Sequence, residues 1–197
     1  MFSKVVLGLG NPGPRYFFTR HNAGFLAVAL MAKKYKAVFS RSGRMVELAR
    51  ATINNHSTLL ARPLTYMNRS GGSYLYLHRE YGIEPSDLLV LVDDINLPMG
   101  AIRIRESGGD GGHNGLLSLI QACETEEFTR IRMGIGPLTG DMTDFVLDPL
   151  RGEDAKRFVE QAKVMAEAAE AVIIKGEQFA MNYYNQRAIQ INHEGEL

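Results

Sequence analysis

The sequence predicts an α/β fold, with a twisted, mostly parallel mixed sheet and helices on both faces. Strand-like and helix-like stretches alternate along most of the chain, which is typical of this class. The run Leu88 to Val92 is entirely apolar and of strand length, as expected for a central strand covered on both faces. The 197 residues, of which 45% are hydrophobic, suffice for one core, so we expect a single domain over 1–197.

In the first half, strands are expected over 4–9, 45–53 and 58–61. The segment 10–14 contains two prolines and two glycines and must be a turn. A helix is expected from Asn22 or Ala23 to about Tyr35, because apolar residues recur there at helical spacing. The loop 63–72 leads into a second predicted helix over 73–81, and strand 88–92 ends on Asp93.

In the second half, apolar and basic residues alternate over 101–105, which predicts a half-exposed strand. A glycine-rich loop over 107–112 leads into a helix over about 114–123, and a strand follows over 129–134. The longest helix is predicted over 152–174 and a shorter one over 179–187, with a frayed tail over 190–197.

Cysteine content and the N-terminal sequence bear on location. The single Cys123 excludes an intramolecular disulfide and a cysteine zinc cluster, which indicates a reducing compartment. The apolar run at the start is short and broken by Gly8 and Gly10, so it predicts neither a signal peptide nor a membrane span. We therefore expect a cytoplasmic protein.

Charge is unevenly distributed although the formal net charge is zero. No acidic residue precedes Glu47, whereas eight basic residues do: Lys4, Arg15, Arg20, Lys33, Lys34, Lys36, Arg41 and Arg44. A cationic face of this kind would attract a polyanion such as a nucleic acid. A solvated basic helix end accounts for this pattern equally well.

Several polar residues follow the predicted strands. In open α/β sheets ligands bind at the carboxyl ends of the strands, so these side chains should meet at one edge. Each has a simple structural role as a turn former, cap or strand-end charge, but jointly they indicate a site. The set is Asn11, His21, Asn68, Asp93, His113 and Asn114. Within it, His21 is the candidate general base.

One competing motif is Gly8-Leu9-Gly10-Asn11-Pro12-Gly13, which matches the dinucleotide-binding Gly-x-Gly-x-x-Gly pattern. That pattern needs a helix that begins within the glycines, but two prolines bracket Gly13 and the stretch before Asn22 is predicted to be extended. The acid expected roughly 20 residues further on is also replaced by lysines. A nucleotide-binding oxidoreductase therefore stays a minor alternative.

Several blocks together resemble bacterial peptidyl-tRNA hydrolases. They include Gly10-Asn11-Pro12-Gly13, Thr19-Arg20-His21-Asn22, Met67-Asn68-x-Ser70-Gly71, Asp93-Asp94-x-x-Leu97-Pro98, Gly111-Gly112-His113-Asn114 and Arg132-Met133-Gly134, in the family's order. The resemblance implies hydrolysis of the ester that joins a peptide to the terminal ribose of tRNA. It also implies a metal-free, cofactor-free, monomeric, cytoplasmic enzyme whose partner is peptidyl-tRNA.

The resemblance and the chemistry together suggest roles for the site residues. His21 would activate water, Asp93 would orient its imidazole, and the Asn11 amide would stabilise the oxyanion. A helix N-terminus beside His21 favours its neutral form and Asp93 favours the charged form, and the sequence leaves the net pKa shift open. The expected substrate-binding residues are Tyr16, Asn22, Met67, Asn68, His113 and Asn114.

The tRNA contacts are expected to be phosphate contacts, since guanidinium groups suit phosphate oxygens. Arg105 and Arg132 match family positions, and Arg103 and Arg130 are neighbouring candidates. The alternative for these alternating arginines is a solvated sheet face. Three departures from the family pattern bear on tRNA affinity: Leu117 replaces a basic residue, Ala29 replaces an acid, and Asp110 adds a negative charge.

Two alternatives to water-mediated ester hydrolysis stay open from sequence. Ser70 lies outside a Gly-x-Ser-x-Gly elbow, so an acyl-enzyme mechanism is the weaker interpretation. A binding module that holds peptidyl-tRNA without cleaving it would follow if His21 and Asp93 were far apart.

Overall fold

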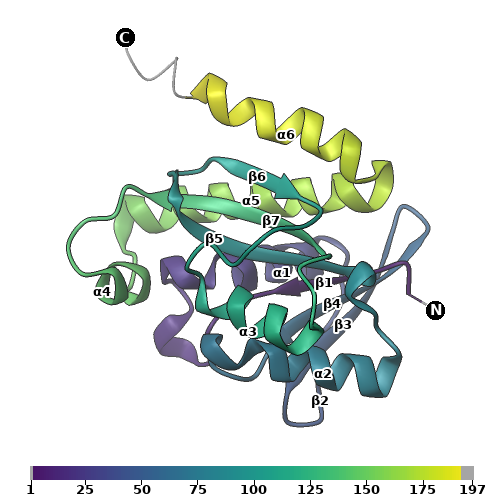
Figure 1. The fold of residues 1–197 in the computed structure, drawn as a ribbon. Helices are drawn as coiled ribbons and strands as arrows, with labels where there is room; N and C mark the ends of the chain where they lie inside the picture. Colours follow the sequence, from purple (N-terminus) through teal and green to yellow (C-terminus); the bar gives the residue numbers. More distant parts are fainter. Residues whose placement is uncertain (1, 192–197) are drawn as a thin grey trace.

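The computed structural model describes the backbone of residues 2–191 and the side chains of residues 2–185 (Figure 1). A seven-stranded sheet has the order β2-β3-β4-β1-β5-β7-β6. The neighbours β4, β1, β5 and β7 are parallel, whereas β2 and β4 pair with β3, and β6 with β7, in antiparallel fashion. The strands are β1 (Lys4–Gly8), β2 (Ser40–Ser42), β3 (Val46–Ile53), β4 (His56–Pro63), β5 (Leu88–Pro98), β6 (Ile102–Arg105) and β7 (Thr129–Gly136). The predicted mixed, mostly parallel sheet is confirmed.

Helices cover both faces of this sheet, as predicted (Figure 1). Helices α1 and α5 pack together on one face, with α6 beside α5 and β6, and α2 and α3 pack together on the other face. The helices are α1 (Ala23–Lys34), α2 (Ser70–Tyr81), α3 (Asn114–Cys123), α4 (Met142–Leu147), α5 (Gly152–Lys175) and α6 (Glu177–Ile191). None of the helices described is long and apolar enough to cross a membrane.

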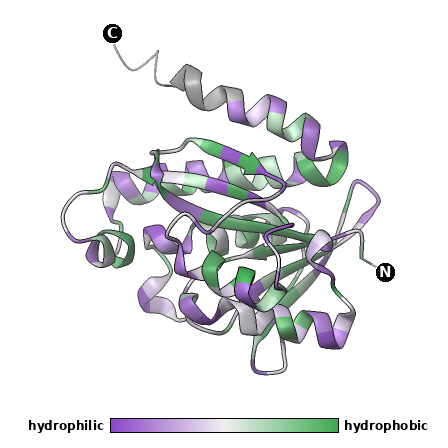
Figure 2. Ribbon diagram, viewed as in Figure 1, coloured by the Kyte–Doolittle hydropathy of each residue, from purple (hydrophilic) through white to green (hydrophobic). Residues whose placement is uncertain are grey.

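Two hydrophobic cores lie on opposite faces of the sheet because strand side chains alternate in direction. Leu89 and Leu91 pack in the core beneath α1 and α5, whereas Leu88, Val90 and Val92 pack in the core beneath α2 and α3. The central strands are accordingly apolar along much of their length (Figure 2). This double coverage explains the continuous apolar run of β5.

Two predicted boundaries and one predicted conformation near the site differ from the structure. Strand β5 continues past Val92 to Pro98, so Asp93 lies within the strand rather than at its end. Helix α2 begins at Ser70, not Ser73, because a 3-10 turn over Met67–Arg69 leads directly into it. The stretch before Asn22 is not extended but forms two 3-10 turns, Pro14–Tyr16 and Arg20–Asn22; the fixed φ of Pro14 suits the first position of such a turn.

Two elements, β2 and α4, were not predicted, since each is short and lacks a clear apolar period. Helix α6 extends from Glu177 to Ile191, beyond the predicted range of 179–187. The predicted frayed tail falls outside the described residues, except for residues 190 and 191, which end α6.

The start of α1 is held tightly against the sheet. A Cβ on Gly24 would clash with the backbone oxygen of Leu91 and the backbone nitrogen of Leu9. The backbone N–H of Phe25 also donates to the Leu9 oxygen at 3.1 Å. Glycine at position 24 thus permits the close approach that fixes the turn carrying His21 at the end of β1.

Candidate active site

A cavity of about 330 Å³ opens where β1 and β5 meet the loops that precede α2 and α3. It lies beyond the carboxyl end of β1, as predicted for an open α/β sheet. Its walls are formed by Asn11, His21, Tyr66, Met67, Asn68, Asp93, Asp94, Ile95, Asn96, Gly111, Gly112, His113, Asn114, Arg132, Met142, Thr143, Val146 and Leu147. Most of the residues singled out in the sequence therefore share one cavity.

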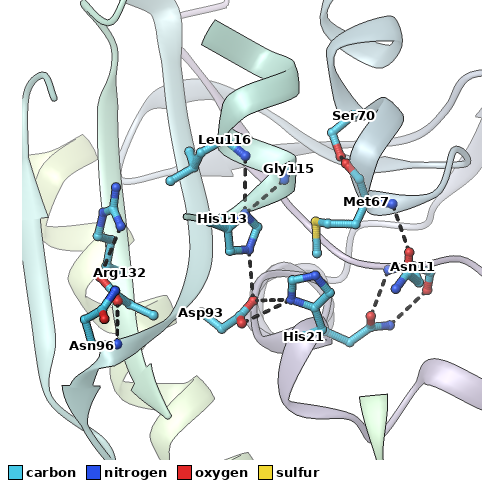
Figure 3. Close-up of polar contacts among 12 residues, drawn as sticks. Asn11, His21, Met67, Ser70, Asp93, Asn96, His113, Gly115, Leu116 and Arg132 are labelled. Atoms are coloured by element: carbon cyan, nitrogen blue, oxygen red, sulfur yellow. Dashed lines mark hydrogen bonds and ion pairs between the residues drawn. The ribbon is translucent and has the colours of Figure 1, made fainter. Parts of the chain in front are cut away.

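His21 and Asp93 form a hydrogen-bonded pair in this cavity (Figure 3). Nδ1 of His21 lies 3.1 Å from both carboxylate oxygens of Asp93, which leaves Nε2 able to accept a proton. Burial lowers the pKa of His21, but the charge of Asp93 and its hydrogen bond outweigh burial, so that the pKa is raised above its ordinary 6.5. The direction of the His21 pKa shift, which the sequence left open, is thus upward.

Asp93 also accepts a hydrogen bond from a second histidine. Nε2 of His113 lies 3.1 Å from Asp93 Oδ1, and the rings of His113 and His21 are 4.9 Å apart (Figure 3). Burial alone would raise the pKa of the Asp93 carboxyl, but the two histidines lower it well below its usual range. Asp93 is therefore an anion despite being almost fully buried.

Asn11 is held by its neighbours in one orientation (Figure 3). Its side-chain oxygen accepts from the backbone N–H of Met67 at 2.9 Å. Its backbone N–H donates to Asn22 Oδ1 at 2.8 Å, and its backbone oxygen accepts from Asn22 Nδ2 at 3.0 Å. With the amide oxygen engaged, the NH₂ group of Asn11 is the part that can donate to a ligand.

Of the six predicted substrate-binding residues, four line the cavity: Met67, Asn68, His113 and Asn114. Asn22 does not, because both its polar atoms bind the Asn11 backbone. Tyr16 is likewise outside the wall and packs edge-on against Tyr66, with 6.4 Å between ring centroids. His113 is the N-cap of α3, and Asn114 is the first residue of that helix.

A second cavity of about 350 Å³ adjoins the first and shares Asp94, Asn96, Gly111 and Arg132 with it. All four predicted phosphate-contacting arginines line it. Arg103 and Arg105 are exposed on β6, as the predicted alternation requires. The two remaining arginines, on β7, are buried.

The buried arginines already have partners within the chain. Arg132 donates to Asp94 at 3.1 Å and to the Gly109 oxygen at 2.6 Å. Arg130 donates to the backbone oxygens of Gly108, Glu126 and Phe128. Burial and the neighbouring Arg132 lower the pKa of Arg130 to about 10. Both side chains thus support the glycine-rich loop.

Comparisons with known sequences identify the family of the chain. The sequence profile of the peptidyl-tRNA hydrolase family matches residues 5–192. A peptidyl-tRNA hydrolase of Thermotoga petrophila is 43% identical over 190 residues, covering 95% of this chain and 100% of the relative. One from Elusimicrobium minutum is 40% identical over 185 residues, covering 93% and 99%. The chain belongs to the peptidyl-tRNA hydrolase family.

A solved structure supports the same assignment. The crystal structure of peptidyl-tRNA hydrolase from Acinetobacter baumannii superposes with a TM-score of 0.85 at 32% identity, covering 94% of this chain and 96% of the other. This likeness extends over nearly the whole of both chains, so the fold is that of the peptidyl-tRNA hydrolase family.

One wall of this peptidyl-tRNA hydrolase cavity was missed in the sequence. Four residues of α4 or its ends line it: Met142, Thr143, Val146 and Leu147. Helix α4 is tied to the His21 turn through Arg20, whose guanidinium stacks 4.2 Å from the Phe145 ring centroid and donates to the Phe145 oxygen at 3.0 Å. These contacts join residues more than 120 positions apart, so no local pattern could predict them.

His21, Asp93 and His113 also have the residue types of a metal site, with candidate ligand atoms all within 4.8 Å of one another. However, Nδ1 of His113 accepts from two backbone N–H groups, so Nε2 carries the proton and lacks the lone pair that a metal needs. The donor set therefore fits a hydrogen-bonded network better than a metal ion.

Proposed function

We propose that the chain hydrolyses the ester between the C-terminal carbonyl of a peptide, or of an N-blocked amino acid, and the 3′-terminal ribose of tRNA. The observation that carries the proposal is the His21–Asp93 pair, at 3.1 Å, within a cavity lined by asparagine amides. Membership of the peptidyl-tRNA hydrolase family supports the substrate class. The reaction would return tRNA from abortive translation to use.

In the proposed mechanism, water attacks the ester carbonyl as Nε2 of His21 accepts its proton. Asp93 keeps the imidazole oriented and stabilises the cation that forms. The ribose oxygen then leaves with a proton from His21, so the products are tRNA and the peptide acid, which loses its remaining proton to solvent to give the carboxylate. The NH₂ of Asn11 donates to the developing oxyanion, and Asn68 and Asn114 bind the peptide backbone and the attacking water.

Direct attack by water is supported by the position of the nearby serine. Ser70 is buried, and its hydroxyl donates to the Met67 oxygen at 2.8 Å. A nucleophilic serine needs an adjacent base, and among the described residues the Ser70 hydroxyl is hydrogen-bonded to the Met67 oxygen and not to His21. A covalent acyl-enzyme is therefore disfavoured.

The cavity walls suit peptides of varied sequence. Polar amides on one side can bind the peptide backbone, which all sequences share. Met67 and Met142, together with Val146 and Leu147, offer an apolar wall, and methionine adapts readily to different side chains. We expect the enzyme to require an acylated α-amino group and so to spare aminoacyl-tRNA.

For tRNA, we propose that the adjoining cavity receives a phosphate of the acceptor end. Arg103 and Arg105 are the exposed guanidinium groups that can contact it directly. Arg130 and Arg132 would contribute positive charge while they support the loop over 107–112. Asp110 and Leu117 are expected to weaken the affinity, by charge repulsion and by the loss of a cation respectively.

The cytoplasmic location and the monomeric state expected from the sequence stay predictions. Fractionation of cells for the native protein and light scattering of the purified chain would test them.

The proposed function is tested by the release of N-acetyl-amino acid from N-acetyl-aminoacyl-tRNA in the presence of a chelator. The native chain should cleave this substrate and spare the unacetylated one. His21→Asn should lose at least ~100-fold in kcat, the lower end for a general base. His56→Asn, outside both cavities, serves as the matched control and should retain activity.

Two results would contradict the proposal. If the native chain binds the substrate without cleaving it, the chain is a binding module. If the His21→Asn variant keeps full activity, His21 is not the base. Saturable binding of a nicotinamide nucleotide in place of turnover would instead favour the oxidoreductase alternative.

A further inference from the structure

We propose that His113 is a positioning residue, fixed as its neutral Nε2–H tautomer, that holds the Asp93 carboxylate in place for His21. It would act through Asp93 and not by contacting the peptide. This role would replace the sequence-based assignment of His113 to substrate binding, and it rests on the proposed hydrolysis.

The tautomer follows from the N-terminus of α3. Nδ1 of His113 lies 3.1 Å from the backbone nitrogen of Gly115 and 3.2 Å from that of Leu116. Both backbone groups can only donate, so Nδ1 must be the acceptor and the ring proton must lie on Nε2. A second proton on Nδ1 would face these two donors and the positive end of the helix dipole. The contacts of Nδ1 thus assign the Nε2–H tautomer to the neutral ring.

The other nitrogen is directed to Asp93. With the proton on Nε2, His113 donates to Asp93 Oδ1 at 3.1 Å. Both ring nitrogens therefore have protein partners, and neither is free to bind a substrate. Its side chain is 7% exposed, compared with 13% for His21, so His21 is the more accessible of the two histidines.

The three groups come from separate segments. Asp93 lies on β5, His21 on the turn before α1, and His113 at the start of α3. A carboxylate held by His21 alone could rotate about its χ angles, whereas a second donor from another element fixes its plane (Figure 3). His113 thereby couples the position of α3, which also carries Asn114, to the orientation of the base.

Other charged groups close to the network have separate partners. Asp94 pairs with Arg132 at 3.1 Å. Arg20, next to His21, has its guanidinium on Phe145. Among the described residues, the hydrogen bonds to the Asp93 carboxylate are those from His21 and His113. His113 is therefore the group that can change how strongly the Asp93 charge acts on His21.

The donor on His113 stabilises the anionic charge of Asp93 and so moderates the attraction that raises the pKa of His21. Without that donor, Asp93 would hold the His21 proton more strongly. The acid limb of kcat/KM, which reports the deprotonation of His21, should then move to higher pH. The maximal kcat should fall as well because the imidazole is less well oriented.

Two amide substitutions test the roles of the two His113 ring nitrogens one at a time. His113→Asn keeps a side-chain acceptor near Gly115 and Leu116, since asparagine is a good N-cap, but it cannot reach Asp93. His113→Gln is longer, and its NH₂ can donate to Asp93. We expect His113→Asn to fold with a modestly lower Tm, because one hydrogen bond to the buried Asp93 is lost, and to show a kcat lower by about tenfold and an acid limb at higher pH. His113→Gln should recover most of the kcat and the native pH profile.

Other outcomes would overturn the proposal. If both variants raise KM and leave the pH profile unchanged, His113 contacts the substrate instead. If His113→Asn has native kcat and pH profile, the residue serves only as a helix cap. The ¹⁵N shifts of the His113 ring give a readout that does not depend on turnover: protonation on Nδ1 would contradict the assigned tautomer. A native chain without hydrolytic activity but with the Nε2–H tautomer would refute the proposed function alone.

Discussion

The side-chain oxygen of Asn11 accepts a hydrogen bond from the backbone N–H of Met67, 2.9 Å away. This contact joins the end of β1 to the turn before α2 and determines which half of the amide can meet a substrate. The NH₂ half is left to donate, as an oxyanion requires. The geometry therefore separates a structural acceptor from a functional donor within one side chain.

Replacing Asn11 with aspartate tests this separation. Asn11→Asp keeps an acceptor for Met67 but removes the donor, so the fold should be retained while kcat falls about 10²- to 10³-fold, as for one lost oxyanion donor. Rates are compared on the plateau of the pH profile, because the added carboxylate also affects His21. Asn96→Asp adds the same charge elsewhere in the cavity and is the control, expected to change KM more than kcat. Equal losses of kcat in both variants would show that charge, not the donor, is responsible.

The pH dependence of hydrolysis should reflect the raised pKa of His21. Since the base must be neutral, native kcat/KM should rise with pH through a midpoint above 6.5. Asp93→Asn removes the charge that raises this pKa and leaves burial, which lowers it, so the midpoint should move to lower pH. At the same time kcat should fall by up to about 10⁴-fold, because an amide can favour the wrong tautomer. A pH profile that keeps its native midpoint in the variant would show that His21 is not the titrating base.

The elements that the sequence predicted well are those with a strong local pattern. Helix α3 begins and ends at the predicted residues, and β1 and β3 differ from prediction by one residue at one end. Asp93 was misplaced relative to its strand, because a polar pair after an apolar run is a usual strand end. Here β7 continues to pair with the Asp93 segment, and only the sheet partner could reveal that.

The candidate site was likewise predicted only in part. The gathering of His21, Asp93 and the asparagines followed from strand ends and from family resemblance. The role of Asn22 as a support for Asn11 depends on a contact across 11 residues, and the α4 wall depends on packing more than 100 residues away. Such assignments need tertiary structure, because neither charge nor periodicity in the sequence distinguishes a lining residue from the one behind it.

The exposed arginines of β6 should contribute to tRNA affinity through phosphate contacts. Arg105→Gln is expected to raise KM for N-acetyl-aminoacyl-tRNA with little change in kcat. It should also reduce the slope of log affinity against log salt concentration by about one, as for a single phosphate contact. Arg79→Gln, which removes an exposed arginine of α2 outside both cavities, is the matched control. Identical salt slopes for Arg105→Gln and the native chain would exclude the contact.

Arg20 should determine how firmly α4 closes the cavity wall. Its guanidinium stacks on Phe145 at 4.2 Å and donates to the Phe145 oxygen at 3.0 Å, whereas methionine keeps only the apolar stem. Arg20→Met should therefore raise KM by about tenfold, the combined effect of these two contacts, and speed amide exchange over 142–147 without affecting α3.

The matched control is Arg15→Met, because Arg15 also lies over an aromatic ring, that of Tyr16 at 5.6 Å, but among the described residues it makes no hydrogen bond, ion pair or ring contact with α4. It should leave KM and the exchange of α4 unchanged. If the Arg20→Met variant behaves like this control, α4 is held by the backbone contacts beside it, which are the Leu150 N–H to the Phe18 oxygen at 2.7 Å and the Thr19–Pro149 bridge. If exchange over 142–147 rises while KM is unchanged, α4 is anchored by Arg20 but its side chains do not bind the peptide.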